Sequence, residues 1–332
     1  MNNSLVQEEV LEPEIPIIDT HHHIWFDSGF PDVPYPPYLL EDLIRDTTAG
    51  HNIVGTVFAE CSAEYRTHGP EHLAPVGETE WVAGQRLKDR GELAGIIAHA
   101  DLRLGSRIGE VLDAHQEAGG DTFKGIRCRA AWDEHFSFPP GKYKIIPGIL
   151  LTGEASDAMT EIAKRDLIFE AWVYHHQLDD FRQLAAKQSN TRFVLEHFGC
   201  PLAVGPYSEK RDEVLAEWRA GLQRLAELDN VFFKIGGLGL YPAVHPDVAA
   251  EPRSSEWLAN YWAREVLFTI ETFKPERCVM ESDFPVDSPM FTYVTFWNIL
   301  KRITAQLSVS ERSLLFHDTA RALYRLNFSP RN

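Results

Sequence analysis

Two histidines separated by one residue, His21 and His23, follow the short apolar segment 15–18 near the start of the sequence. In a β-strand successive side chains point to opposite faces, so these two imidazoles share one face and His22 points to the other. Two neutral imidazoles on one face can bind a divalent metal ion. Such a pair also occurs in polar clusters that bind nothing, so a metal site needs further ligands from elsewhere in the chain.

Further histidines and charged residues stand at the ends of other apolar, β-branched segments. His175 follows residues 169–174, His197 follows 193–196, Asp283 follows 278–282, and Glu60 and Lys234 close the segments 57–59 and 231–233. If these segments are parallel strands of a barrel, their carboxyl ends open on one face, where residues remote in sequence meet. We therefore predict one site that combines His21, His23, His175, His197 and Asp283, and these residue types suit zinc or a similar divalent ion.

The segments that carry these residues alternate with longer amphipathic ones, which is the pattern of parallel strands covered by crossover helices. Eight strands are predicted, near residues 15–20, 53–60, 93–98, 123–127, 167–174, 192–196, 231–235 and 277–281. Helices are predicted at residues 79–89, 106–118, 178–188, 209–228, 255–273, 293–303 and 310–326. This order predicts an α/β protein of the (β/α)8, or TIM-barrel, class.

The length of 332 residues fits a single barrel domain with extended βα loops, because such barrels run to roughly 250 residues or more. Residues 1–14 are polar and acidic and are predicted to form a flexible N-terminal tail, and residues 15–328 are predicted to form the barrel. The Pro-rich segment 30–37 and the segment 132–153 are predicted to be long loops near the active site. No repeat, linker or low-complexity segment divides the chain.

The formal net charge is −17, from 49 acidic and 32 basic residues. Such a field repels phosphate backbones and anionic membranes, so we expect a small-molecule substrate rather than nucleic acid or a membrane. The four cysteines are spread along the chain without a C-x-x-C pair, which argues against a disulfide scaffold or a thiolate zinc site. Because the chain has neither a signal-peptide pattern nor a long apolar run, we expect a cytoplasmic protein, with a homodimer or larger homo-oligomer left open.

Several motifs place the sequence beside a known family. They are Asp19-Thr20-His21-His22-His23-Ile24-Trp25, Ala59-Glu60-Cys61-Ser62-Ala63-Glu64-Tyr65-Arg66, Gly77-Glu78-Thr79-Glu80-Trp81, Leu195-Glu196-His197-Phe198-Gly199 and Glu281-Ser282-Asp283-Phe284-Pro285. With them the sequence resembles the amidohydrolase-related branch of the amidohydrolase superfamily, and within it the group of sugar-acid lactonases and the 2-pyrone-4,6-dicarboxylate lactonase. The resemblance covers residues 15–326 and is specific for the fold and the superfamily, but not for the substrate.

The resemblance implies roles for the histidines and the aspartate. In many members of the superfamily the first-strand pair, the fifth-strand histidine and the eighth-strand aspartate hold one metal ion, and the sixth-strand histidine contacts the attacking water or the substrate oxygen. In this sequence the corresponding ligands are His21, His23, His175 and Asp283, and the sixth-strand residue is His197. The implied cofactor is one Zn²⁺, with Mn²⁺ as the alternative ion. The pyrone-dicarboxylate lactonase group works without a bound metal, so metal-free catalysis by similar residues stays open.

Five further residues are candidates for contact with the substrate: Arg127, Glu60, Tyr65, Arg66 and Tyr174. Arg127 ends the fourth predicted strand, where a guanidinium can bind a substrate carboxylate in a bidentate manner. A salt bridge at the rim of the barrel is the alternative role for this arginine. Aromatic residues at strand ends often serve only to pack, which is the alternative for the two tyrosines.

The predicted reaction is hydrolysis of a small lactone, with or without a carboxylate, by water. Asp283 would be the general base, and His197 would stabilise the oxyanion of the tetrahedral intermediate. The same framework could instead support metal-dependent, non-oxidative decarboxylation of an aromatic or enoic acid. A catalytically silent barrel that only binds a ligand is the alternative of another class, and the presence of all five site residues argues against it.

Overall fold

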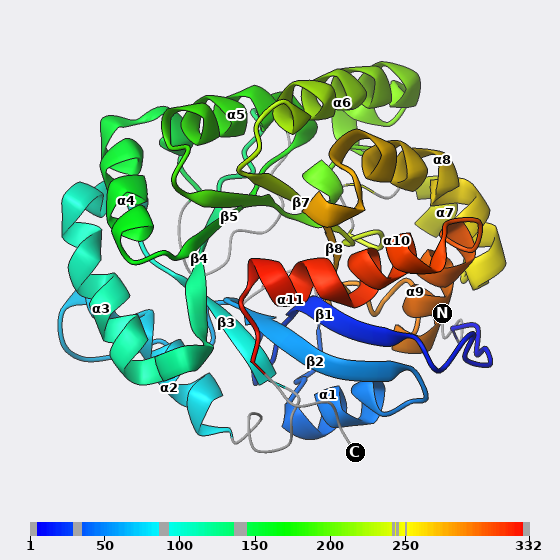
Figure 1. The fold of residues 1–332 in the computed structure, drawn as a ribbon, viewed down its shortest axis with the longest axis horizontal. Helices are drawn as coiled ribbons and strands as arrows, with labels where there is room; N and C mark the ends of the chain where they lie inside the picture. The colour runs from blue at the N-terminus through cyan, green and yellow to red at the C-terminus, as the bar shows by residue number, and fades with distance from the viewer. Residues whose placement is uncertain are drawn as a thin grey trace.

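The computed structural model describes residues 5–28, 35–85, 93–135, 145–240, 243, 246–249 and 251–327. Eight parallel strands lie in one sheet in the order of the sequence (Figure 1). They are Pro16–His22 (β1), Asn52–Ala59 (β2), Leu93–His99 (β3), Phe123–Arg129 (β4), Ile168–Trp172 (β5), Arg192–Leu195 (β6), Val231–Ile235 (β7) and Cys278–Met280 (β8). Just beyond β8, Phe284 forms a parallel bridge with His22, so the last strand returns to the first. The predicted (β/α)8 barrel is confirmed.

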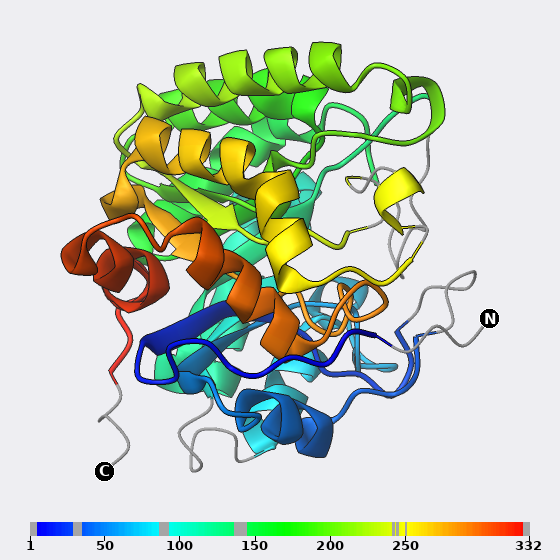
Figure 2. The same ribbon diagram turned by 90° about the vertical axis from the view of Figure 1, so that its right-hand side faces the viewer.

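Helices surround the strands, and the last helices lie across one end of the barrel (Figure 1). They are Leu40–Thr47 (α1), Val76–Gly84 (α2), Ile108–Gly119 (α3), Gly153–Lys164 (α4), Leu178–Lys187 (α5), Arg211–Ala226 (α6), Pro246–Ala249 (α7), Ser255–Phe273 (α8), Tyr293–Ile303 (α9), Val309–Ser313 (α10) and Thr319–Leu323 (α11). In Figure 2, α8 runs between α6 and α9 and contacts both. The ends of the predicted helices at 255–273 and 293–303 match α8 and α9.

The described helices differ from the predicted ones in two ways. The predicted helix 310–326 is divided, because a π-helical turn at Leu314–Asp318 separates α10 from α11. Three helices, α1, α4 and α7, were not among those predicted. The end of the predicted helix 79–89, parts of the predicted loops 30–37 and 132–153, and the ends of the N-terminal tail and of the barrel domain lie outside the described residues.

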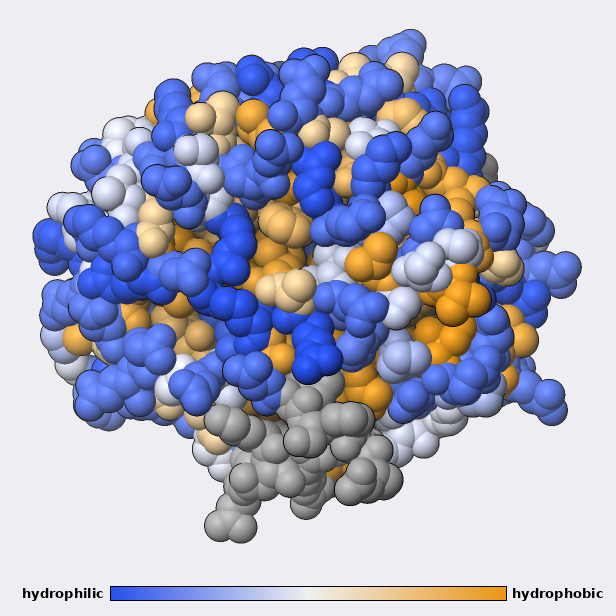
Figure 3. Space-filling view, viewed as in Figure 1, coloured by the Kyte–Doolittle hydropathy of each residue, from blue (hydrophilic) through white to orange (hydrophobic). Residues whose placement is uncertain are grey.

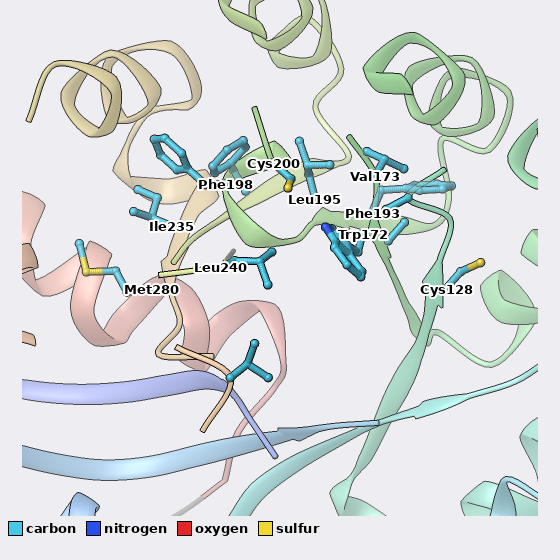
Figure 4. Packing of buried hydrophobic residues seen from close by; sticks show 14 of the residues in the cluster. Cys128, Trp172, Val173, Phe193, Leu195, Phe198, Cys200, Ile235, Leu240 and Met280 are labelled. Atoms are coloured by element: carbon cyan, nitrogen blue, oxygen red, sulfur yellow. The ribbon is translucent and has the colours of Figure 1, made fainter. Parts of the chain in front are cut away.

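The core has two parts, one inside the barrel and one between the barrel and its helices. Inside, β-branched residues of six strands pack against the C-terminal segment; this set is Ile18, Val57, Ile97, Ile168, Val194 and Val279 with Ala320, Leu323, Tyr324 and Leu326. Outside, Figure 4 shows Val173 and Leu195 directed toward the helices, while Trp172 points away from them. The alternation of neighbouring side chains between these two cores is what directs polar residues into the barrel.

Part of the predicted N-terminal tail lies along α9. The backbone N–H of Leu11 donates to Asn298 Oδ1 at 3.0 Å. Lys301 Nζ donates to the carbonyls of Leu11 and Glu12 at 2.9 and 2.7 Å. The described part of this segment is therefore hydrogen-bonded to an outer helix of the barrel.

One face of the surface is largely hydrophilic. In Figure 3, hydrophilic residues cover most of the face that is toward the viewer, with apolar residues visible between them. No helix in the described ranges has the length and apolarity needed to cross a membrane. All four cysteines, Cys61, Cys128, Cys200 and Cys278, are buried and free.

A buried hydrogen bond joins the C-terminal segment to the barrel interior and gives a first prediction. Tyr324 Oη donates to Glu170 Oε1 at 2.7 Å, and Lys234 Nζ donates to Glu170 Oε2 at 2.7 Å. Tyr324→Phe leaves the buried Glu170 carboxylate with one donor fewer, so we expect the free energy of unfolding to fall by about 1–3 kcal/mol. Urea unfolding of the two proteins measures this difference. An unchanged free energy would show that the bond contributes nothing net.

Candidate active site

The ends of β1 and β8 bring three potential metal ligands together. Nε2 of His21 and Nε2 of His23 lie 3.3 Å apart. Oδ1 of Asp283 lies 3.7 Å from the first of these nitrogens and 3.4 Å from the second. All three side chains are buried. The backbone N–H of Asp283 donates to the carbonyl of His21 at 3.0 Å, which joins the segment after β8 to β1.

The three atoms have the spacing of ligands around one ion. Tetrahedral ligands at about 2.0–2.1 Å from zinc lie roughly 3.3 Å from one another. Both side-chain oxygens of Asp283 are buried, and among the described residues neither has a hydrogen-bond partner. Buried polar atoms without partners are rare in native proteins, and a bound ion can satisfy them. The donor set at His21, His23 and Asp283 therefore fits a divalent metal.

The neutral state of the imidazoles supports the same conclusion. Burial, followed by the charges of Lys234 and Arg127, holds the pKa of His21 well below its usual range. Burial also lowers the pKa of His23, although the neighbouring Asp283 carboxylate opposes the shift. Nδ1 of His23 lies 2.8 Å from the carbonyl oxygen of Ala59. A proton on this Nδ1 leaves the lone pair on Nε2 free for a metal.

The surrounding charges leave room for a cation. Four buried carboxylates, Glu170, Glu196, Glu281 and Asp283, gather with two buried cations, Lys234 and Arg127. Arg127 Nη2 lies 2.7 Å from Glu196 Oε2, and Lys234 Nζ lies 3.8 Å from Glu281 Oε2. When all are ionised, this set carries two negative charges in excess, of which a protonated His197 would balance one.

Two other groups of potential ligands contain His21, one with His197 and Glu281 and one with Glu170 and Glu196. A protein cation already faces each of them. Lys234 Nζ lies 3.3 Å from Nδ1 of His21 and 2.7 Å from Glu170 Oε2. A metal ion in either place would sit beside that ammonium, so electrostatics favours the group with His23 and Asp283.

His197 lies beside this cluster. Its Nδ1 is 3.8 Å from Oδ2 of Asp283, and its ring centroid is 4.7 Å from that of His21. Burial opposes protonation of His197, but the carboxylates of Asp283 and Glu281 outweigh it and raise the pKa. A positive imidazole here can stabilise negative charge on a reacting oxygen.

The backbone at these two residues is strained. His197 has φ of 49° and Asp283 has φ of 55°, which is the left-handed region that residues other than glycine rarely adopt. A Cβ atom on Gly237 would lie 3.0 Å from Cβ of His197, so this glycine makes room for the turn. Strained backbone of this kind occurs preferentially at functional sites.

His175, the ligand predicted at the end of the fifth strand, lies elsewhere. It begins a 3₁₀ turn after β5 instead of continuing the strand. Its ring packs against Tyr207 at a centroid distance of 5.3 Å, and its Nε2 is 3.8 Å from Glu217 Oε2. None of the three ligand groups found among the described residues includes it. The residue that β5 places beside His197 is Trp172, at a centroid distance of 5.7 Å.

Arg127 is buried inside the barrel, and its charge is matched by a carboxylate of the protein. It forms a bidentate pair with Glu196, and its Nη1 donates to the carbonyl of Glu60 at 2.7 Å. Its Nη2 lies 3.3 Å from Nε2 of His197. Arg127 therefore contacts His197 from inside the barrel. The salt bridge that we gave as its alternative role forms in the barrel interior and not at the rim.

The other four predicted substrate contacts lie in three different environments. Glu60 is buried and accepts a hydrogen bond from Tyr65 Oη at 2.7 Å, and Arg129 lies 3.9 Å from its other oxygen. Arg66 pairs with Glu80 at the surface, with 3.1 Å between Nε and Oε2. Tyr174 is buried, and its ring stands perpendicular to Trp172. Hence Glu60 and Tyr65 form one unit beside Arg127, whereas Arg66 has its partner on the protein surface.

Sequence reasoning placed Lys234 at a strand end but assigned no role to the inward-facing carboxylates of Glu170, Glu196 and Glu281 below the site. Glu281 lies two residues before Asp283, and Glu196 lies just before His197. Glu170 and Lys234 lie on β5 and β7 and point into the barrel toward each other. The signal that could have found them is a charged residue within an otherwise apolar strand, since an unpaired buried charge is strongly disfavoured.

Comparison with known proteins identifies the family of the chain. A family model described as amidohydrolase matches residues 18–326, which is nearly the whole chain. The chain belongs to the amidohydrolase family. It is therefore a hydrolase of the amidohydrolase superfamily, as its motifs predicted.

Two curated relatives of this amidohydrolase are 30% identical to it. One is the uncharacterized protein y4mH of Sinorhizobium fredii, aligned over 330 residues that cover 94% of this chain and 99% of the relative. The other is the L-fucono-1,5-lactonase of Burkholderia multivorans, aligned over 162 residues that cover 48% of this chain and 52% of the lactonase.

Solved structures share the fold at lower identity. A zinc-bound amidohydrolase of Burkholderia multivorans superposes with a TM-score of 0.73 at 21% identity, covering 94% of this chain and 99% of that one. A probable 2-pyrone-4,6-dicarboxylic acid hydrolase of Acinetobacter baumannii has a TM-score of 0.62 at 16% identity, covering 93% and 99%. The manganese-bound 5-carboxyvanillate decarboxylase of Novosphingobium aromaticivorans has a TM-score of 0.59 at 13% identity, covering 95% and 97%.

Proposed function

We propose that this amidohydrolase hydrolyses a lactone, the cyclic ester of a small hydroxy acid. The observation that carries the proposal is the buried Asp283 carboxylate, whose oxygens have no hydrogen-bond partner among the described residues and lie beside His21, His23 and His197. The similarity to an L-fucono-1,5-lactonase supports an ester substrate over an amide.

In the proposed reaction, water attacks the ester carbonyl carbon while Asp283 accepts one of its protons. The bond between the carbonyl carbon and the ring oxygen then breaks. The proton held by Asp283 passes to the departing alkoxide, so the product is an open-chain hydroxy acid. A base that captures a proton and returns it needs no outside donor.

His197 has the second role. It lies 3.8 Å from the oxygen of Asp283 that is farther from His23, so a substrate oxygen next to this carboxylate is also close to the imidazole. Asp283 and Glu281 favour the charged form of His197 by raising its pKa, against the effect of burial. A positive imidazole stabilises the oxyanion that forms when water adds to the carbonyl.

The proposed cofactor is one Zn²⁺, held by His21, His23 and Asp283. When bound, a divalent ion supplies Lewis-acid polarisation of the ester carbonyl. Zinc in a Burkholderia multivorans amidohydrolase of the same fold supports this choice of ion, and manganese in a decarboxylase of that fold is the alternative. Metal content of the purified protein, measured by elemental analysis, tests the assignment.

The test of function is a substrate panel on metal-loaded and chelator-treated protein. Aldono-1,5-lactones and 2-pyrone-4,6-dicarboxylate are followed by proton release at constant pH, and aromatic and enoic acids by release of carbon dioxide. We expect catalysed opening of at least one lactone and loss of that activity after chelation. Release of carbon dioxide without lactone opening would replace the proposal by decarboxylation. A folded protein without turnover or metal would indicate a silent barrel.

A further inference from the structure

One buried carboxylate, that of Glu281, contacts two of the imidazoles in the site. Its Oε2 lies 2.9 Å from Nδ1 of His21. Its Oε1 accepts the backbone N–H of His197 at 2.8 Å and lies 3.2 Å from Nδ1 of that ring. The side chain of Glu281 is fully buried, so its position depends on these contacts.

Nδ1 of His21 can either carry a proton or accept one, because two neighbours of opposite charge face it. The Glu281 carboxylate at 2.9 Å accepts a proton, whereas the ammonium of Lys234 at 3.3 Å donates one. Lys234 already donates to Glu170 Oε2 at 2.7 Å and to the carbonyl of Thr20 at 2.9 Å. Glu281 Oε2 has no hydrogen-bond partner among the described residues, although Nδ1 of His21 lies 2.9 Å from it. A buried carboxylate oxygen needs a donor, and the nearest one is a proton on Nδ1.

We propose that Glu281 is a positioning residue that keeps the proton of His21 on Nδ1 and thereby turns the lone pair of Nε2 toward His23 and Asp283. The ring nitrogen that carries no proton is the one that can bind a metal, and the group that contacts the other nitrogen selects it. The inference rests on the proposed function only in assigning Nε2 of His21 to a metal.

The same carboxylate orients His197. Arg127 Nη2 lies 3.3 Å from Nε2 of His197, and a guanidinium can only donate. In the neutral ring Nε2 is therefore the acceptor, and the proton is on Nδ1, which faces Glu281. Nδ1 of His197 makes no hydrogen bond among the described residues, but it lies 3.2 Å from Glu281 Oε1, which accepts the backbone N–H of the same residue. Glu281 therefore contacts both the proposed metal ligand and the residue that stabilises the oxyanion.

Glu281→Gln is a sharp test because the structure dictates how the amide would lie. The backbone N–H of His197 requires an acceptor where Oε1 is, so the amide oxygen takes that place. The amide NH2 then occupies the place of Oε2 and donates to Nδ1 of His21. This exchange moves the ring proton to Nε2 and blocks metal binding there.

The experiment is long-range nitrogen-15 NMR of histidine-labelled, metal-free protein, with the His21 signals assigned from a His21→Gln variant. We expect the Nδ1–H tautomer of His21 in the unaltered protein and the Nε2–H tautomer in Glu281→Gln. Chelator competition with Zn²⁺ is expected to show an affinity about 10- to 100-fold weaker in Glu281→Gln.

Glu170→Gln is the matched control, because it removes one buried carboxylate from the other side of Lys234 without touching Nδ1 of His21. It is expected to keep the Nδ1–H tautomer. The inference is overturned if the unaltered protein shows the Nε2–H tautomer, if Glu281→Gln leaves the tautomer unchanged, or if both variants change it alike. Lactone turnover enters neither measurement, so a protein with the expected tautomers but no lactonase activity would refute only the proposed function.

Discussion

Replacing Asp283 by asparagine is expected to lower kcat for lactone opening by about 10³-fold or more, because an amide cannot accept the proton of the attacking water. Fold and stability are expected to change little. The two side chains have the same shape, and the contact that joins this segment to β1 is made by the backbone N–H of Asp283. Steady-state kinetics on the best lactone of the panel measures the loss, and circular dichroism verifies the fold.

A nearby carboxyl provides the control for this variant. Asp287 is also fully buried, and its Oδ2 accepts the backbone N–H of Gly239 at 2.8 Å. Burial and the charge of Asp283 hold the pKa of Asp287 well above its usual range, so an amide there replaces a neutral group. Asp287→Asn is expected to lose far less activity than Asp283→Asn. A folded Asp283→Asn enzyme with unchanged turnover would exclude Asp283 as the base.

The barrel and the core of the site could be predicted because both follow from alternation along strands. His21 and His23 are two residues apart on β1, so they share a face wherever the strand lies. Asp283 follows the last strand of a barrel, and closure of the barrel places it next to the first strand. Such relations need only the order of the elements, which the hydrophobic pattern reveals.

His175 shows where this reasoning stops. Alternation holds only while the chain is extended, and β5 ends at Trp172, earlier than the predicted 174. The 3₁₀ turn at His175–Gln177 then sets the direction of the ring. A difference of two residues in a strand end decides whether a side chain enters the site, and the sequence does not fix strand ends that closely.

The charges inside the barrel were harder to interpret for another reason. Arg127 is visible in the sequence as a cation at a strand end, but its partner Glu196 comes from two strands away. Which acid neutralises which base depends on how far each strand is shifted along the barrel axis. That shift is set by packing of the whole sheet, which one sequence does not reveal.

The ion pair of Arg127 and Glu196 gives the second prediction with a large effect. Arg127→Met is expected to lower the free energy of unfolding by about 3–5 kcal/mol, because it leaves the Glu196 carboxylate buried without its counter-charge. The double variant Arg127→Met/Glu196→Gln removes the charge as well and is expected to recover part of the loss. Urea unfolding at neutral pH measures four proteins, namely the unaltered protein, each of the two single variants and the double variant. A double variant that is as unstable as two independent losses would show that the two charges do not depend on each other.

The pH dependence of the difference in unfolding free energy between the unaltered protein and Arg127→Met is a stricter test. Burial alone would raise the pKa of Glu196, but Arg127, His197 and Lys234 outweigh it and lower the pKa from 4.5 to about 2. Since this pKa is lower in the folded state, the ionised carboxylate stabilises the fold above about pH 4.5 and that stability is lost as the pH falls toward 2. Arg127→Met removes the main source of the shift, so the stability gap to the unaltered protein is expected to narrow as the pH is lowered below 4.5. A gap that stays constant over this range would mean that Arg127 stabilises the fold by packing and not through the charge of Glu196.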